Sequence, residues 1–220
     1  MTSLTLHPPW LSFDLGEDMQ VLSWAIHRPG LVWATRILWR EVRNADLPLD
    51  LDVAAWLDSE LRERAAEDAV TFLTSRSIQT YTTHDARVGD AHVFAVATTG
   101  LSNAERVGQR VERTGQSWGT INVALRSSQG LCEAALLEAM SIAVEARTTA
   151  ILDAAVALPS GTATGTGTDC VAVAAPSGTL RYTGKHTETG EAIGRAVYGA
   201  VRDGADQWKA SMRETDNAAT

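Results

Sequence analysis

The chain has 220 residues, of which 45% are hydrophobic and 21% charged, and it carries a formal net charge of −8. This length suits one sizeable core, so we expect a single domain over residues 1–220. The negative charge disfavours non-specific binding to nucleic acid or to anionic membranes. We see neither a secretory signal nor an uncharged apolar run long enough to cross a bilayer, and two cysteines imply no disulfide framework. We therefore expect a cytoplasmic protein without nucleic-acid or membrane partners, and the sequence leaves its oligomeric state open.

In the first half of the chain, alternating apolar patterns and turn residues predict short elements. They are strands at 10–14 and 20–25 around the turn Gly16-Glu17-Asp18, helices at 31–39 and 51–66, and paired strands at 78–84 and 92–98. Asp50 or Asp52 is the expected cap of the second of these helices.

In the second half of the chain, the sequence predicts a polar connection at 102–117, followed by two strands and two helices. They are a strand at 119–126, a helix at 129–152 capped by Ser127 or Ser128, a short buried strand at 171–175 and a helix at 187–208. Because strands come in runs interrupted by single helices, we expect an α+β fold with a mixed, substantially antiparallel sheet covered by helices. Residues 1–9 and 212–220 are expected to be disordered or frayed.

Two Gly/Thr-rich turns bracket the strand at 171–175. The first contains Gly165, Thr166, Gly167, Thr168 and Asp169, and the second contains Gly184, Lys185, His186 and Thr187. Successive glycines expose backbone N–H groups that can hold an anion or an oxyanion, although residues 161–168 could equally be a flexible linker. We expect the two turns to fold side by side into the lip of one pocket.

The second turn also resembles the end of a phosphate-binding loop. However, five residues rather than four separate Gly178 from Gly184, and His186 replaces the hydroxyl that would bind magnesium. A nucleotide-dependent transferase therefore stays an alternative. His186 itself is either a capping or packing histidine, or an acid–base group at a helix N-terminus.

Arg147 projects into the apolar arc of its predicted helix, near Leu136 and Met140. A buried guanidinium needs a partner, so it either reaches solvent or a structural carboxylate, or contacts Asp169 or a ligand. The histidines lack metal-ligand spacing and no G-x-S-x-G motif is present, so we expect neither a protein-bound metal nor the usual serine hydrolase.

The ordered set of segments resembles the adenosylcobinamide amidohydrolase family of corrinoid salvage, from about residue 21 to residue 198. The segments that carry the resemblance are Gly100-Leu101-Ser102-Asn103, Gly119-Thr120-Ile121-Asn122, Glu145-Ala146-Arg147-Thr148, residues 163–169, and Gly184-Lys185-His186 with residues 190–197. The resemblance implies hydrolysis of the amide between the corrin propionyl side chain and aminopropanol, which gives adenosylcobyric acid. It implies a corrinoid substrate, which alone would bring cobalt, and no separate cofactor.

Amide hydrolysis needs an activated nucleophile, a stabilised oxyanion and a proton for the leaving amine. We expect Asp169 or His186 to activate water, His186 to protonate the amine, and Lys185 with the backbone of 165–168 to stabilise the oxyanion. The expected substrate-binding residues are Asn103, Asn122, Arg147, Gly165, Thr166, Gly167, Thr168, Gly184 and Thr187. Thr168 or Thr187 as a covalent nucleophile, and a non-catalytic corrinoid carrier, stay open.

Overall fold

The computed structural model describes residues 2–48, 50–112 and 119–218. Its helices are α1 (Val53–Glu63), α2 (Glu133–Ala154) and α3 (Glu188–Ala218), with 3-10 turns at Asn44–Asp46 and Ile78–Thr80. The strands are β1 (Ser3–His7), β2 (Trp10–Ser23), β3 (Gly30–Glu41), β4 (Val70–Thr74), β5 (Thr82–Val88), β6 (Ala91–Thr99), β7 (Ala104–Glu105), β8 (Ile121–Ser127), β9 (Ala157–Leu158), β10 (Gly161–Thr162), β11 (Gly165–Thr166) and β12 (Cys170–Ala175).

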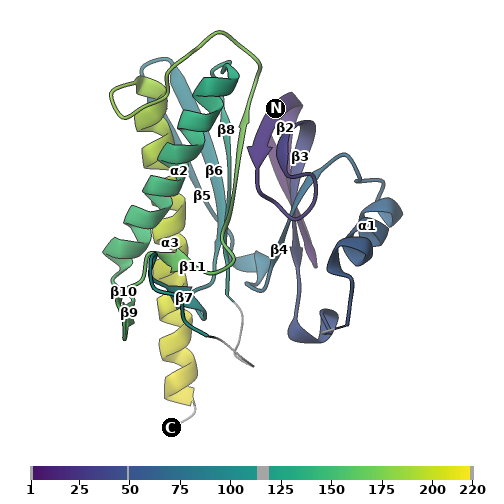
Figure 1. Ribbon diagram of the computed structural model, residues 1–220, viewed down its shortest axis with the longest axis vertical. Helices are drawn as coiled ribbons and strands as arrows, with labels where there is room; N and C mark the ends of the chain where they lie inside the picture. Colours follow the sequence, from purple (N-terminus) through teal and green to yellow (C-terminus); the bar gives the residue numbers. More distant parts are fainter. Residues whose placement is uncertain (1, 49, 113–118, 219–220) are drawn as a thin grey trace.

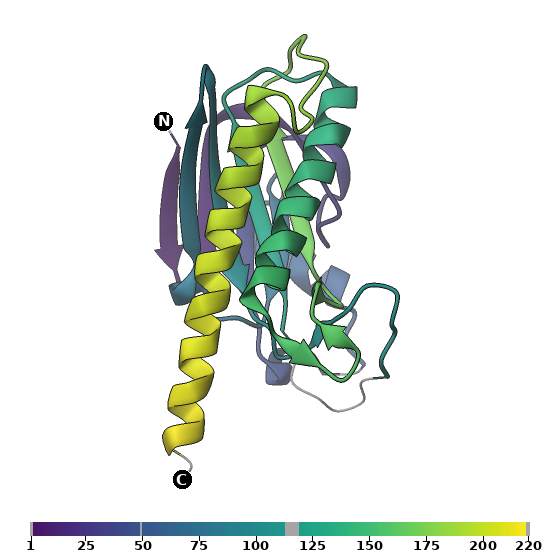
Figure 2. The same ribbon diagram turned by 90° about the vertical axis from the view of Figure 1, so that its left-hand side faces the viewer.

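One large sheet organises the molecule. Its strands follow the order β4-β3-β2-β12-β8-β6-β5, and β1 pairs with β2 beside this path. Within the described ranges, β12 runs parallel to β8 and β3 runs parallel to β4, whereas the other pairs of this sheet are antiparallel. Helices α2 and α3 lie side by side over one face (Figures 1 and 2). The predicted α+β fold with a mixed, helix-covered sheet is confirmed.

The core lies on both faces of this sheet. Under α2 and α3, Val123 and Val173 from the central strands are fully buried. On the other face the sheet curls over itself, so that the ring of Phe13 in β2 lies 5.7 Å from that of Phe94 in β6, three places along the sheet. Because β12 is buried on both sides, its sequence is apolar throughout, and the predicted strand at 171–175 is confirmed.

Residues 31–39 form the strand β3, so the helix predicted there is wrong. Val32, Trp33 and Ile37 are β-branched or aromatic and fit a pleated surface, and β3 pairs with β2 on one side and β4 on the other. These partners come from elsewhere in the chain, and a local pattern cannot show them. The strands predicted at 10–14 and 20–25 are one strand, β2, interrupted by a bulge between Asp14 and Met19.

Several boundaries also differ from the predictions. Helix α2 begins at Glu133 with Cys132 in the cap position, not Ser127 or Ser128, because Leu131 first bridges to the segment after β12. Helix α1 is capped by Asp52, as expected. The strand predicted at 78–84 begins at Thr82, after a 3-10 turn.

The prediction that residues 1–9 are disordered or frayed is wrong for Ser3–His7, whereas the same expectation for residues 212–220 stays a prediction. Ser3–His7 is the strand β1, which pairs with β2 along its whole length. Helix α3 continues to Ala218, and its Lys209 Nζ donates 2.8 Å to the carbonyl of Ala154 at the end of α2. Residues 219 and 220 lie outside the described residues.

The packing predicts unequal effects for two substitutions of the same type. Leu125 in β8 is fully buried, whereas Leu137 on α2 is 58% exposed. We expect Leu125→Ala to lower the free energy of unfolding by about 2–5 kcal/mol through a cavity and lost burial. Leu137→Ala should change it by only about 0.5 kcal/mol. Urea unfolding followed by circular dichroism measures both, and equal losses would contradict the packing described here.

Candidate active site

Polar side chains gather where the parallel strands β8 and β12 begin. Thr120 and Asn122 at the start of β8 are buried, and Asp169 immediately precedes β12. The parallel register pairs Cys170 with Asn122, which brings both strand starts to the same edge of the sheet. Buried polar groups require partners, so this edge is the first place to look for a functional site.

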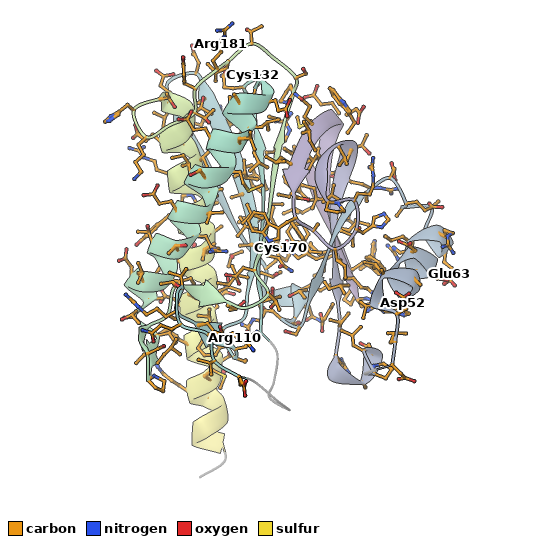
Figure 3. All side chains as sticks on the ribbon, viewed as in Figure 1. Asp52, Glu63, Arg110, Cys132, Cys170 and Arg181 are labelled. Carbon is orange, nitrogen blue, oxygen red and sulfur yellow. The ribbon has the colours of Figure 1, made fainter. Side chains whose placement is uncertain are left out.

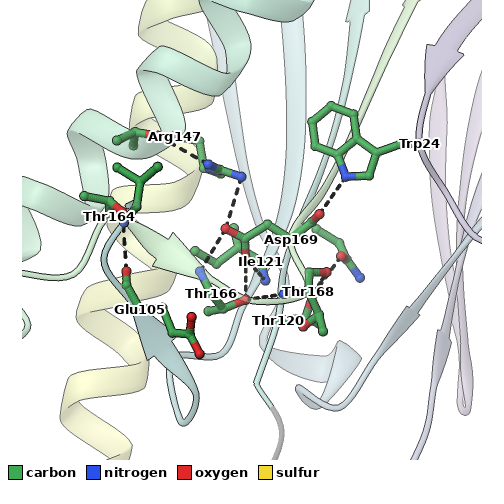
Figure 4. Close-up of polar contacts among 12 residues, drawn as sticks. Trp24, Glu105, Thr120, Ile121, Arg147, Thr164, Thr166, Thr168 and Asp169 are labelled. Atoms are coloured by element: carbon green, nitrogen blue, oxygen red, sulfur yellow. Dashed lines mark hydrogen bonds and ion pairs between the residues drawn. The ribbon is translucent and has the colours of Figure 1, made fainter. Parts of the chain in front are cut away.

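The carboxylate of Asp169 is the centre of this cluster (Figure 4). Its Oδ1 accepts from the backbone N–H of Ile121 at 3.1 Å and from the hydroxyl of Thr166 at 2.5 Å. Its Oδ2 accepts from the backbone N–H of Thr166 at 3.0 Å and lies 3.0 Å from Arg147 Nη1. Four donors from β8, β11 and α2 therefore converge on one side chain.

The electrostatics of Asp169 combine opposing effects. Its side chain is only 6% exposed, and burial raises the pKa of this carboxyl, while Arg147 and the donors from Thr166 and Ile121 act in the lowering direction. A carboxylate offers about four lone-pair sites, and all of them face donors here. Asp169 is therefore held firmly, with no acceptor site left over for a water molecule.

Arg147 comes from the face of α2 that points toward this edge of the sheet. Its side chain is 12% exposed, Nη2 donates to Thr148, and the buried Nε has no hydrogen-bond partner within the described part of the chain. Of the two interpretations of Arg147, contact with Asp169 is confirmed.

The segment 161–168 is fixed by tertiary contacts, so the flexible-linker alternative is wrong. β11 pairs with β7, and the N–H of Thr164 donates to the carbonyl of Glu105 at 2.8 Å. A Cβ on Gly165 would lie 2.4 Å from Asp169 Oδ2, so this position admits only glycine without displacing the carboxylate.

A cavity of about 540 Å³ opens beside the Arg147–Asp169 pair. Residues 105–110 form one wall, and Thr164–Gly167 with Arg147 and Asp169 form the other. Glu105, Arg106 and Arg110 bring further charges to it. These three were missed by the sequence analysis, because they stand in an irregular connection without a recognisable spacing.

A second, mainly apolar pocket of about 320 Å³ lies against the same segment and includes Ile26, Leu73, Thr168 and Cys170 in its lining. Next to Cys170 in the chain, the carbonyl of Asp169 accepts a 2.7 Å hydrogen bond from the indole Nε1 of Trp24, which is 43% exposed. Burial and the neighbouring Asp169 raise the pKa of the Cys170 thiol to about 11, so it stays protonated at neutral pH.

The second turn does not join this site, and the prediction of one shared pocket is wrong. Asp169 precedes β12, whereas Lys185 and His186 follow its other end, and the strand alone extends about 17 Å. Figure 3 shows Arg181, on the way to the second turn, at the opposite end of the molecule from Arg110 of the cavity. The physical reason is that the extended strand β12 lies between Asp169 and the second turn, so residues that are close in the sequence end up far apart.

The second turn is instead tied to helix α2. Lys185 Nζ is paired with Glu145, and the N–H of Thr183 donates 2.6 Å to Glu138 Oε2. His186 is exposed, and Lys185 lines a separate groove between α2 and α3. A Cβ on Gly184 would lie 2.7 Å from Glu138 Oε1. A carboxylate therefore occupies the position where a phosphate-binding turn would need an anion.

The remaining predicted residues make internal hydrogen bonds. Asn103 Oδ1 accepts from the N–H of Gly119 at 3.0 Å, and Asn122 Nδ2 donates to the carbonyl of Leu73 at 2.7 Å. The hydroxyls of Thr168 and Thr187 donate to the carbonyls of Gly119 and Gly184. A substrate-binding role for these four side chains stays a prediction.

Two kinds of feature are absent from the described residues. They contain no group of three or more His, Cys, Asp or Glu side chains placed to hold a metal ion. None of their helices has both the length and the apolar character that a membrane span requires.

Comparison with known protein families assigns the chain to a class of amidohydrolases. A sequence model of the adenosylcobinamide amidohydrolase family matches residues 2–213. The chain belongs to the adenosylcobinamide amidohydrolase family, as its motifs predicted.

Other comparisons add little. No curated protein matches the chain significantly. Among solved structures, the PH0078 protein from Pyrococcus horikoshii OT3 is similar at 10% identity, with a TM-score of 0.45, over 89% of this chain and 76% of that one.

The contact at Gly165 predicts a strong effect of a small substitution. Gly165→Ala must displace the Asp169 carboxylate and should lower the melting temperature by several degrees. Gly194→Ala is the matched control, because a Cβ there meets nothing within 4 Å and alanine favours the helix. Differential scanning calorimetry compares the two, and an unchanged or raised melting temperature for Gly165→Ala would contradict the geometry.

The buried ion pair predicts non-additive stability. Asp169→Asn leaves the guanidinium of Arg147 buried without its counter-charge and should cost about 3–5 kcal/mol of unfolding free energy. Adding Arg147→Met should recover part of that loss, because the uncompensated charge is removed. Guanidinium unfolding of the two single variants and the double variant measures the coupling, and strictly additive losses would show that the pair does not interact.

Proposed function

We propose that this protein hydrolyses the amide that joins the corrin propionyl side chain to aminopropanol in adenosylcobinamide. The products are adenosylcobyric acid and 1-amino-2-propanol. The reaction takes place in the cavity beside Arg147 and Asp169. Family membership supports the class of reaction and substrate, and the buried Arg147–Asp169 pair at that cavity is the observation that carries the location.

The cavity offers what amide hydrolysis requires. The transition state places negative charge on the carbonyl oxygen, and Arg106, Arg110 and Arg147 line the cavity where such charge would be stabilised. Asp169 supplies a buried carboxylate that can hold a proton between the attack and the departure of the amine. The catalytic role first expected for Lys185 and His186 has no such support, because neither lines this cavity and Lys185 pairs with Glu145 in the groove between α2 and α3.

The contacts of the second turn argue against a nucleotide-dependent transferase. Glu138 accepts the N–H of Thr183, and Glu145 neutralises Lys185, so the second turn already holds two carboxylates. A phosphate would have to displace them against charge repulsion. A corrinoid carrier without activity is distinguished by experiment.

The test is incubation of the purified protein with adenosylcobinamide, followed by mass analysis of the corrinoid and assay of free aminopropanol. We expect conversion to adenosylcobyric acid with release of one amine. Tight binding without release of aminopropanol would contradict hydrolysis and favour a carrier.

Three variants locate the reaction within the molecule. Asp169→Asn should lower kcat by at least about 100-fold, because the proton acceptor is lost. Asp203→Asn, an exposed position on α3, is the matched control and should keep wild-type turnover. His186→Ala should change kcat less than about threefold. A loss in His186→Ala as large as in Asp169→Asn would move the reaction to the second turn.

A further inference from the structure

We propose that Thr166 is the nucleophile of this reaction and that hydrolysis passes through an ester between its Oγ and the corrin propionyl group. The inference rests on the proposed function and specifies its chemistry. It replaces direct attack by water with two successive displacements on the same carbonyl carbon.

Hydrogen bonds connect the nucleophile Thr166 to the base Asp169, and Arg147 orients that base. The hydroxyl of Thr166 donates to Asp169 Oδ1 at 2.5 Å, and Arg147 holds Oδ2 of the same carboxylate at 3.0 Å. Thr166 lines the cavity, and its own backbone N–H is fixed by Asp169 as well. A hydroxyl bonded to a base that a third group holds in place is the arrangement found in nucleophilic hydrolases.

The acceptor sites of Asp169 are already filled by donors, and this favours the Thr166 hydroxyl over a water molecule as the attacking group. All four acceptor sites of the carboxylate face donors, so a water molecule has none to bind. The proton of Thr166, in contrast, already lies along a hydrogen bond to Oδ1 and needs no rearrangement to transfer.

Other nucleophiles are less suited by their contacts. The hydroxyls of Thr168 and Thr187 donate to backbone carbonyls, at 2.9 Å and 2.8 Å, and a carbonyl cannot act as a base. The thiol of Cys170, with its pKa of about 11, stays protonated at neutral pH.

The two steps balance as follows. In the first, Thr166 Oγ attacks the amide carbon and gives its proton to Asp169; the C–N bond breaks, and the aminopropanol nitrogen takes that proton and leaves as the free amine. Once the ester forms, Thr166 no longer donates to Oδ1, which frees one acceptor site for water. In the second step, water attacks the ester carbon and gives a proton to Asp169, the C–Oγ bond breaks, and Thr166 recovers its proton.

Two substitutions at position 166 separate the hydroxyl from the shape of the side chain. Thr166→Val keeps the branched shape that suits β11 but has no hydroxyl, and should lower kcat at least about 100-fold. Thr166→Ser keeps the hydroxyl and should stay within about tenfold of wild type. Thr5→Val, at an exposed position in β1, is the matched control and should leave turnover unchanged. Melting temperatures verify that each variant is folded.

A trapping experiment tests for the ester directly. Hydroxylamine added to wild-type protein and adenosylcobinamide should divert part of the product to the corrinoid hydroxamate, because it competes with water for the acyl group. Acid-quenched protein should carry the corrinoid acyl mass on the tryptic peptide 148–181, at Thr166. A residue that only supports the structure produces neither signal.

The outcomes separate the two proposals. Hydroxamate formation by wild type and by Thr166→Ser, and an acyl mass at position 166, support the nucleophile even if Thr166→Val does not fold. Hydrolysis that gives only the acid at every hydroxylamine concentration, or a folded Thr166→Val with near wild-type turnover, overturns the nucleophile and leaves the hydrolase. Failure of wild type to release any aminopropanol overturns both.

Discussion

The buried carboxylate of Asp169 is the constraint on which this end of the molecule depends. It receives donors from β8, β11 and α2, and its backbone carbonyl receives the indole of Trp24. An ionised carboxylate in this setting is stable only because each oxygen is satisfied, and removal of the carboxylate would leave its donors buried and unpaired. One side chain, that of Asp169, thus holds the start of β8, the glycine-rich segment and helix α2 together.

This constraint explains why residues far apart in the chain act together. Parallel pairing of β8 and β12 brings two strand starts to one edge, and α2 returns from the far end of β8 to place Arg147 above them. Residues 105–110 then close the side of the cavity. The location proposed for the chemistry is therefore a product of topology, with each contribution coming from a different element.

The sequence predicted the fold class and the central strand, because buried strands leave a local pattern. It offered contact between Arg147 and Asp169 as one alternative, because a charged residue in an apolar helix face needs a partner. It could not predict that 31–39 is a strand, since that depends on pairing with β2 and β4. It also placed His186 beside Asp169 on grounds of sequence proximity, although β12 separates them. The nucleophilic role proposed for Thr166 and the place of residues 105–110 in the cavity wall rest on three-dimensional contacts, and no sequence spacing distinguishes these residues.

The cavity wall formed by residues 105–110 bears on how ligand preference can change between related proteins. Apart from the two-residue strand β7, this wall belongs to no regular element, and the large sheet does not run through it. Changes of side chain at Val107 or Gln109 can reshape the cavity without altering the ion pair, the β7–β11 pairing or the arginines of the wall. Substitutions at these two positions can therefore change which ligands the cavity admits while the Arg147–Asp169 pair and the segment that carries Thr166 stay in place.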